Sequence, residues 1–300
     1  LIERIWNMTY KSGFISVIGR PNVGKSTLVN RIIGEKIAIT SPKPQTTRNR
    51  LHAVYTEERG QIIFVDTPGV LKGKNELDRY MLDQVYKSLD GIDLAIFLID
   101  ATTYFGRGDE FIFQELQNYK TPTLVVLNKI DKLKIEELDE KIKEIKEKTG
   151  LDIIPVSALD GRNIDYLIDV IFQHLPEGPQ YYPDDMITDQ IEQFIIAEMI
   201  REKIFLLTRE EIPYGIAVLI EEMKERENGL FYIRADIYVE KDSHKGIIIG
   251  KDGRMLKQIG KLAREDIEQL LQTDIYLDLW VKVLKDWRTK EELVRRMGYR

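Results

Sequence analysis

The segment from Gly19 to Ser26 constrains the fold of this chain more than any other feature. It reads Gly-Arg-Pro-Asn-Val-Gly-Lys-Ser, follows an apolar run typical of a buried strand, and precedes a stretch with helical periodicity. The pattern G-x-x-x-x-G-K-[S/T] at a strand-to-helix turn indicates a phosphate-binding loop. Its glycines let backbone N–H groups approach phosphate oxygens, and the helix N-terminus adds positive potential. The bare pattern also occurs in turns without a ligand, but this placement favours phosphate.

Short apolar runs alternate with longer helix-patterned stretches up to about His174. The runs are continuous rather than alternating in polarity, as expected of strands covered by helices on both faces. The alternation predicts a mostly parallel α/β sheet. The expected strands are 13–19, 61–66, 94–100, 123–128 and 152–157, and the expected helices are 26–34, 75–89, 109–119, 135–149 and 164–174.

Three prolines and a glycine between Pro176 and Pro183 predict a linker. A length of 300 residues also favours two domains. We therefore expect one domain over residues 1–180 and a second over residues 181–300. The second is expected to contain a helix at 188–207, strands at 216–224 and 230–240, a helix at 254–271, a strand at 274–284 and a final helix.

Composition excludes several kinds of site. The chain has no cysteine and only 3 histidines, which excludes disulfides, thiolate metal sites and a histidine-based metal site. No apolar run approaches the roughly 20 residues that span a bilayer, so we expect no transmembrane segment. The net charge of −6 argues, by itself, against a nucleic-acid partner.

Three further polar segments each begin at the end of an expected strand. Asp66-Thr-Pro-Gly69 offers a carboxylate for Mg²⁺ and the Gly69 N–H for a γ-phosphate. A strand-ending Asp is also a common cap, but the phosphate loop favours the metal role. In that loop, we expect Lys25 to bridge the β- and γ-phosphates and Ser26 to ligate Mg²⁺.

The segment Asn128-Lys-Ile-Asp131 is expected to select the base of a bound nucleotide. The Asp131 carboxylate can accept hydrogen bonds from N1–H and the 2-amino group of guanine, whereas adenine presents a lone pair at N1 and no amino group at C2. A site built on such bonds rejects the wrong base strongly. Asn128 is expected to tie the loops together, and the Lys129 stem is expected to lie over the purine. The fourth motif, Ser157-Ala158-Leu159, comes at the end of another expected strand and would offer the Ala158 N–H to guanine O6.

These four motifs, in this order, resemble those of the GTPase domain of the translation-factor class. The residues of the first two motifs are typical of its bacterial Era-like branch. The resemblance implies a first switch at 35–49 and a second at 67–75. It implies that Thr47 ligates Mg²⁺, with Thr46 as the alternative, beside Ser26 and Asp66. The implied GTP-binding residues are Gly19, Arg20, Pro21, Asn22, Val23, Gly24, Lys25, Ser26, Thr27, Asp66, Thr67, Pro68, Gly69, Val70, Asn128, Lys129, Asp131, Ser157, Ala158 and Leu159.

The sequence lacks a residue that many GTPases use in the hydrolytic step. Many regulatory GTPases carry a glutamine directly after Asp-x-x-Gly to orient the attacking water, and this chain has Val70 there. Intrinsic hydrolysis is therefore expected to be slow. The resemblance implies that Asn22 helps to bind K⁺, which supplies positive charge; alternatively, Asn22 only shapes the loop. The expected catalytic set is Lys25, Asn22, Thr47 and Gly69.

The second domain contains Gly250-Lys-Asp-Gly253, a G-x-x-G motif that is weak alone. On the helix that follows, Lys257, Lys261 and Arg264 share one side and apolar residues the other. Residues 241–264 carry seven Lys/Arg against two Asp, which gives a local basic patch despite the acidic total. A solvated basic helix face is the plain alternative.

The order helix-strand-strand-helix-GxxG-helix-strand resembles a type II KH domain, the bacterial type, which clamps about four nucleotides of single-stranded RNA. A GTPase domain followed by a KH domain implies a ribosome-assembly GTPase that binds GTP and GDP and acts on the 3′ region of 16S ribosomal RNA and the small subunit. It also implies a cytoplasmic monomer, with partial peripheral association with the inner membrane. The expected RNA-binding residues are Lys245, Gly250, Lys251, Asp252, Gly253, Arg254, Lys257 and Lys261.

Two other functions stay open from the sequence. The first is a metabolic phosphotransferase that uses the same phosphate loop, although no acceptor-substrate base is recognisable. The second is an RNA-binding module whose nucleotide site is only structural.

Overall fold

A computed structural model describes residues 9–41, 43–69, 74–226 and 229–299, which form two compact units. The first contains most of the described chain up to Asp189, and the second begins at Gln190 and also includes residues 39–46 and 74–80. Residues just after the expected boundary near 180 still pack with the first unit. The N–H groups of Tyr181 and Tyr182 donate to Gln61 Oε1 at 2.9 and 3.0 Å.

The first unit is built on a six-stranded sheet in the order β2-β3-β1-β4-β5-β6. Every neighbouring pair is parallel except β2 and β3, which run antiparallel at the edge. All seven residues of β4 are buried, as expected of a central strand covered on both faces. The strands are β1 Lys11–Ile18, β2 Leu51–Glu57, β3 Gly60–Asp66, β4 Leu94–Asp100, β5 Thr123–Asn128 and β6 Ile153–Pro155.

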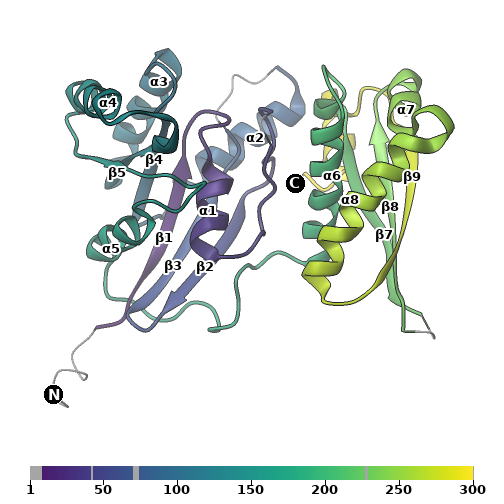
Figure 1. The fold of residues 1–300 in the computed structure, drawn as a ribbon, viewed down its shortest axis with the longest axis horizontal. Helices are drawn as coiled ribbons and strands as arrows, with labels where there is room; N and C mark the ends of the chain where they lie inside the picture. Colours follow the sequence, from purple (N-terminus) through teal and green to yellow (C-terminus); the bar gives the residue numbers. More distant parts are fainter. Residues whose placement is uncertain (1–8, 42, 70–73, 227–228, 300) are drawn as a thin grey trace. The chain divides into compact units, whose positions relative to one another are not determined.

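Helices cover both faces of this sheet, which confirms the predicted α/β class. Figure 1 shows α1 and α5 on the near face and α3 behind the sheet. Phe97 of β4 stacks on Phe113 of α3, with 5.9 Å between the ring centroids. All five expected helices form: α1 Lys25–Ile33, α2 Glu76–Lys87, α3 Arg107–Tyr119, α4 Ile135–Thr149 and α5 Ile164–His174.

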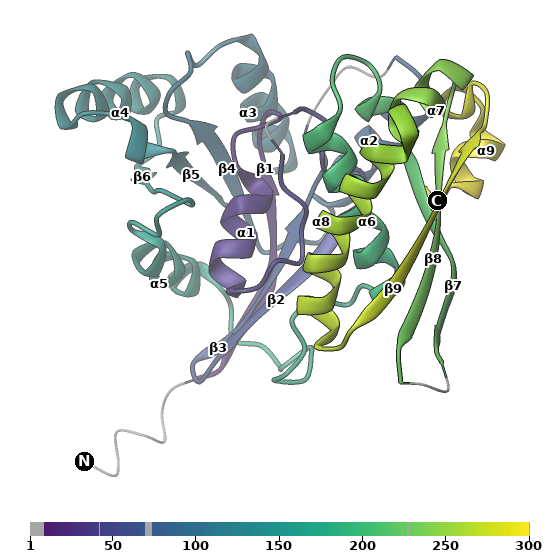
Figure 2. The same ribbon diagram turned by 45° about the vertical axis from the view of Figure 1, so that its right-hand side comes forward.

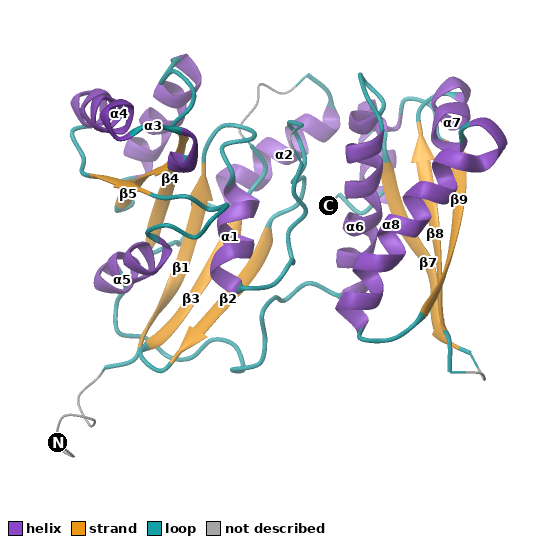
Figure 3. Ribbon diagram, viewed as in Figure 1, coloured by secondary structure: helices purple, strands orange, loops and turns teal. Residues whose placement is uncertain are grey.

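The second unit has a three-stranded sheet in which β8 lies between β7 and β9 (Figure 2). β7 and β8 are antiparallel, whereas β8 and β9 are parallel. The helices α6 and α8 cover one face of the sheet (Figure 3), and Ile196, Ile237 and Ile259 are fully buried between them. The elements are α6 Glu192–Leu207, β7 Ala217–Glu225, β8 Phe231–Val239, α7 Asp242–Ile249, α8 Arg254–Leu271, β9 Ile275–Val283 and α9 Glu291–Arg296.

Three elements differ from the local sequence pattern. The sequence pattern predicts no strand at β2, because an edge strand is only half-buried and lacks a continuous apolar run. Helix α7, which the family resemblance implies, is not apparent from the local sequence, because Gly246 and the β-branched run 247–249 disfavour a helix. Helix α6 begins at Glu192, not Thr188, because Thr188 pairs with Ala53 beside β2.

Candidate active site and nucleic-acid interface

The loop between β1 and α1 needs both of its motif glycines. Gly24 has a φ of 103°, and a Cβ atom there would lie 2.3 Å from Asn128 Nδ2. A Cβ atom on Gly19 would lie 2.4 Å from the carbonyl oxygen of Leu98. Because both distances are too short for real side chains, only glycine permits this close packing. The N-terminus of α1 thereby remains open to an anion.

Lys25 is buried at the centre of this loop, with 7% of its surface exposed. Its Nζ donates to the carbonyl oxygens of Gly19 and Arg20 at 3.1 and 3.2 Å. Burial lowers the pKa of Lys25 to about 8, although the nearby Asp66 carboxylate acts in the opposite direction. A phosphate beside this ammonium would supply the negative charge that favours its protonated form.

Arg20 does not direct its guanidinium at the phosphate loop. Its Nε donates to Asp109 Oδ1 at 2.8 Å, and its Nη2 donates to Thr103 Oγ1 at 2.6 Å. Asp109 is fully buried and also accepts from the Gly106 N–H at the start of α3. The side chain of Arg20 therefore anchors the loop to α3, and only its backbone is available to a phosphate.

Three oxygen-bearing side chains meet beside α1. Ser26 Oγ donates to Asp66 Oδ2 at 2.8 Å and lies 2.9 Å from Thr47 Oγ1. Asp66 is fully buried, and burial raises its pKa despite the nearby Lys25. Among the described residues, its second oxygen, Oδ1, has no hydrogen-bond partner. The cluster offers only oxygen donors and one buried, unsatisfied carboxylate oxygen, which suits Mg²⁺.

The two candidate threonines of the first switch belong to different units. Thr47 lies in the first unit beside Ser26. Thr46 lies in the second unit, where its Oγ1 donates to the carbonyl oxygen of Lys43 at 2.8 Å. In the same unit, the Thr40 N–H donates to Glu202 Oε1 of α6 at 2.9 Å. The geometry therefore brings Thr47, and not Thr46, to the oxygen cluster.

The segment after Asp66 approaches the phosphate loop closely. A Cβ atom on Gly69 would lie 2.8 Å from Pro21 Cα, so glycine is required there. Thr67 is buried, and its Oγ1 donates to the carbonyl oxygen of Val17. Its side chain therefore supports the strand β1 and does not face a ligand. Val70 lies outside the described residues.

The residues expected to recognise the base lie together at the ends of β5 and β6. Asn128 Nδ2 donates to the Val23 carbonyl oxygen at 2.8 Å, and its Oδ1 accepts from the Ala158 N–H at 3.0 Å. Asn128 thus ties the phosphate loop to the segment 157–159. Ser157 Oγ donates to Asp131 Oδ1 at 2.8 Å, which orients the carboxylate.

Sequence reasoning missed one partner of this site. Lys129 Nζ donates to the Asn22 carbonyl oxygen at 2.6 Å and contacts Asp100 Oδ2 at 2.5 Å. Asp100 ends β4 as Asp66 ends β3, so a strand-ending carboxylate on β4, which pairs with β5, was the available signal. Asp100 holds the Lys129 stem across the phosphate loop.

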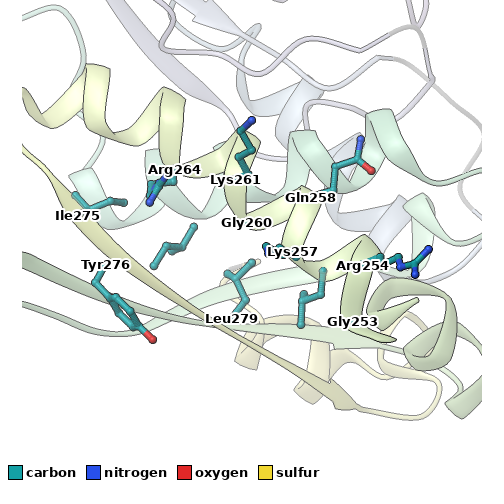
Figure 4. Close-up of a pocket in the computed structure, with 12 residues that line it drawn as sticks. Gly253, Arg254, Lys257, Gln258, Gly260, Lys261, Arg264, Ile275, Tyr276 and Leu279 are labelled. Atoms are coloured by element: carbon teal, nitrogen blue, oxygen red, sulfur yellow. The ribbon is translucent and has the colours of Figure 1, made fainter. Parts of the chain in front are cut away.

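The second unit contains a groove between α8 and β9 with a volume of about 780 Å³. Figure 4 shows the charged residues of α8, including Lys257 and Lys261, along one side and residues of β9 along the other. The groove therefore combines cations with an apolar wall, as a single-stranded nucleic acid requires. Its lining residues are Gly253, Arg254, Leu256, Lys257, Gln258, Gly260, Lys261, Arg264, Ile275, Tyr276, Leu277 and Leu279.

Half of the expected RNA-binding residues line this groove. Gly253, Arg254, Lys257 and Lys261 do so, whereas the other four lie outside its lining. Those four are Lys245, Gly250, Lys251 and Asp252. The wall contributed by β9 was not predicted, because only the pairing of β9 with β8 brings that strand beside α8.

Comparisons with known proteins agree with this geometry. The sequence profile of a family described as "50S ribosome-binding GTPase" matches residues 14–129, and that of a family described as "KH domain" matches residues 211–288. GTPase Era of Halothermothrix orenii is 61% identical over 293 residues, which cover 98% of this chain and 100% of that relative. The type of both domains is thereby confirmed.

Solved structures give the same result. A single-residue variant of Aquifex aeolicus Era bound to GDP·AlF4⁻ is 43% identical, with a TM-score of 0.94 and coverage of 96% of this chain and 99% of that one. An Era complex with MgGDPNP and nucleotides 1506–1542 of 16S ribosomal RNA is also 43% identical, with a TM-score of 0.94 and coverage of 97% and 99%. These similarities favour the GTPase over the phosphotransferase hypothesis.

Proposed function

The chain belongs to the GTPase Era family, and on that premise we propose that it binds GTP, hydrolyses it, and uses the cycle to control RNA binding during 30S assembly. One observation carries the proposal. The phosphate loop, the oxygen cluster around Ser26 and the base-reading residues meet at one end of a single sheet, while a basic groove occupies the second unit.

The phosphate half of the site follows from its donors. Backbone N–H groups of the segment 19–27, other than that of Pro21, which has none, would cradle the phosphates, and the Lys25 ammonium would exchange its two carbonyl partners for phosphate oxygens. The Gly69 N–H would donate to the γ-phosphate. Ser26, Thr47 and Asp66 would hold Mg²⁺, because their oxygens already meet and Asp66 Oδ1 lacks a partner among the described residues. Mg²⁺, when bound, supplies charge that stabilises the leaving phosphate.

Guanine selection rests on Asp131. Its carboxylate would accept from N1–H and the 2-amino group of guanine, and Ser157 keeps it oriented for this. Lys129 would lie over the purine, held by Asp100. Thus a guanine nucleotide would satisfy groups that adenine leaves unpaired.

We also propose that K⁺ assists hydrolysis, with Asn22 as one of its ligands. Asn22 has a φ of 66°, so the loop holds it in a conformation that favours Asn or Gly. A cation there would supply positive charge to a site that has Val70 in place of the water-orienting glutamine. The ion contributes charge beside the phosphates, as an arginine does in other GTPases.

RNA would bind in the groove of the second unit. The backbone of single-stranded RNA would pass the Gly250–Gly253 turn, with its phosphates near Lys257 and Lys261 and its bases against β9. The complex of a 43% identical relative with 16S nucleotides favours the small subunit, whereas the family name "50S ribosome-binding GTPase" matches only the nucleotide-binding half.

In this proposal, residues 1–180 act as the GTPase domain and residues 181–300 as the RNA-binding domain of a cytoplasmic monomer, with partial peripheral association with the inner membrane. Within the described ranges, none of the helices has the length and apolar character needed to cross a bilayer. Size-exclusion chromatography tests the monomer, and co-sedimentation with anionic vesicles tests the peripheral association.

The central experiment measures nucleotide and RNA affinities of the purified chain. Calorimetry is expected to show tight GTP and GDP binding and no measurable ATP binding. An oligonucleotide with the 3′ sequence of 16S ribosomal RNA is expected to bind with different affinity in the presence of a non-hydrolysable GTP analogue and of GDP. Equal RNA affinities in the two states would refute the switch, and a preference for ATP would refute the base assignment.

A further inference from the structure

Helix α1 carries a residue whose side chain contacts the segment 157–159, which also contacts Asn128. Arg31 lies in the last turn of α1, and its Nε donates to the carbonyl oxygen of Ala158 at 3.1 Å. Its Nη2 also donates to the carbonyl oxygen of Leu159. Arg31 itself is exposed, so these two bonds rather than close packing hold its guanidinium.

These bonds fix the orientation of the peptide between residues 158 and 159. A trans peptide is planar and carries its C=O and N–H on opposite sides. Because the Ala158 carbonyl faces Arg31, the Leu159 N–H points away from Arg31. No described residue accepts a hydrogen bond from that N–H, whereas the Ala158 N–H already donates to Asn128 Oδ1.

We infer that Arg31 is a positioning residue for guanine recognition, which orients the peptide between residues 158 and 159 so that the backbone N–H of Leu159 is presented to guanine O6. This inference rests on the proposed guanine site. It assigns a specificity role to a residue that contacts neither the base nor the phosphates.

The geometry of α1 explains why this residue suits the role. The helix begins at Lys25, whose ammonium serves the phosphates, and it rises about 1.5 Å per residue. Arg31 therefore lies about 9 Å further along the same rigid helix. One element thus sets the spacing between the triphosphate and the segment 157–159.

The test compares Arg31→Met with the unaltered chain using GTP and 6-thio-GTP, both with Mg²⁺. The two nucleotides share N1–H and the 2-amino group, but sulfur at position 6 is a weak acceptor. We expect Arg31→Met to weaken GTP binding about tenfold, as the loss of one ordinary hydrogen bond would, and 6-thio-GTP binding less than threefold. Arg31→Lys, which keeps one donor, is expected to recover part of the loss, and kcat at saturating GTP is expected to stay within about twofold.

Arg107→Met serves as the matched control, because Arg107 is also an exposed arginine at a helix of the first unit. It is expected to change neither affinity. If Arg31→Met weakens both nucleotides equally, or neither, the positioning role is refuted even where the unaltered chain prefers GTP to ATP. If the unaltered chain shows no such preference, the proposed guanine site itself fails.

Discussion

Replacing Asp131 with asparagine is the most informative change to the base site, because it alters hydrogen-bonding groups and almost no volume. In the structure, Asp131 is partly exposed and one oxygen, Oδ1, accepts from Ser157 Oγ at 2.8 Å. Asparagine can keep one acceptor but presents an NH₂ group where guanine also presents a donor. The xanthine base carries a carbonyl at C2 in place of that amino group, so it suits asparagine.

The size of the effect follows from the bonds that change. Each hydrogen bond to a charged group contributes about 1.5–3 kcal/mol. Asp131→Asn removes the charge from two such bonds and leaves one donor facing another donor. Partial exposure of the site reduces the net loss, which we place at about 3 kcal/mol, or about a hundredfold weaker GTP binding. XTP binding is expected to improve by at least about tenfold, because a carboxylate no longer opposes the C2 carbonyl.

Titration calorimetry with GTP and XTP measures both changes directly. Asp139→Asn is the control, because Asp139 is an exposed aspartate on α4, outside the site. The reasoning is refuted if Asp131→Asn binds GTP as tightly as the unaltered chain does, or if its preference for GTP over XTP is unchanged.

Four further outcomes are expected. Lys25→Met is expected to abolish GTP turnover yet stabilise the nucleotide-free protein by about 1–2 kcal/mol in urea unfolding, because it removes a buried ammonium whose pKa burial lowers to about 8; lower stability would contradict this. GTP turnover is expected to be faster in K⁺ than in Na⁺, and Asn22→Gly, which tolerates the positive φ, is expected to abolish that difference. Lys261→Ala is expected to reduce the slope of log RNA affinity against log salt by about 1, and an unchanged slope would place Lys261 outside the interface. Ile259→Ala, at a fully buried position of α8, is expected to cost about 2–5 kcal/mol of unfolding free energy, measured in urea.

The residues of the nucleotide site could be predicted because their positions follow from a simple rule of parallel sheets. Asp66 and Asn128 end their strands and Ser157 follows β6, and the carboxyl ends of parallel strands meet at one edge of the sheet. The motifs also state which residue types occur there. Asp100 obeys the same rule but belongs to none of the motifs, so only the structure reveals its contact with Lys129.

Side-chain direction could not be predicted for Arg20 and Arg31. Arg20 lies in the phosphate loop, where a cation is expected to serve the phosphates, whereas Arg31 lies in the last turn of α1. Their guanidiniums instead bond to Asp109 of α3 and to the carbonyl oxygen of Ala158. Both partners lie more than 80 residues away in the sequence, and local spacing carries no information on such contacts.

The groove of the second unit could also be predicted only in part. Helical periodicity placed Lys257 and Lys261 on one side of α8, because a helix repeats every 3.6 residues whatever it packs against. The opposite wall comes from β9, which pairs in parallel with β8. In the chain, α7 and α8 connect β8 to β9. This long crossover brings β9 beside α8, and local sequence spacing does not reveal it.

The adjacent threonines of the first switch show most clearly why a motif alone is insufficient. Thr46 and Thr47 carry identical side chains, and the sequence favours Thr47 only because it directly precedes Arg48. The structure separates them because residues 39–46 belong to the second unit, where α6 supplies Glu202 to the Thr40 N–H. Thr47 is the first residue after this segment that belongs to the nucleotide-binding unit, and its hydroxyl meets Ser26. A ligand that binds to Thr47 together with Ser26 and Asp66 therefore contacts a segment whose preceding residues are held by α6, which gives the nucleotide site a covalent connection to the unit that contains the groove.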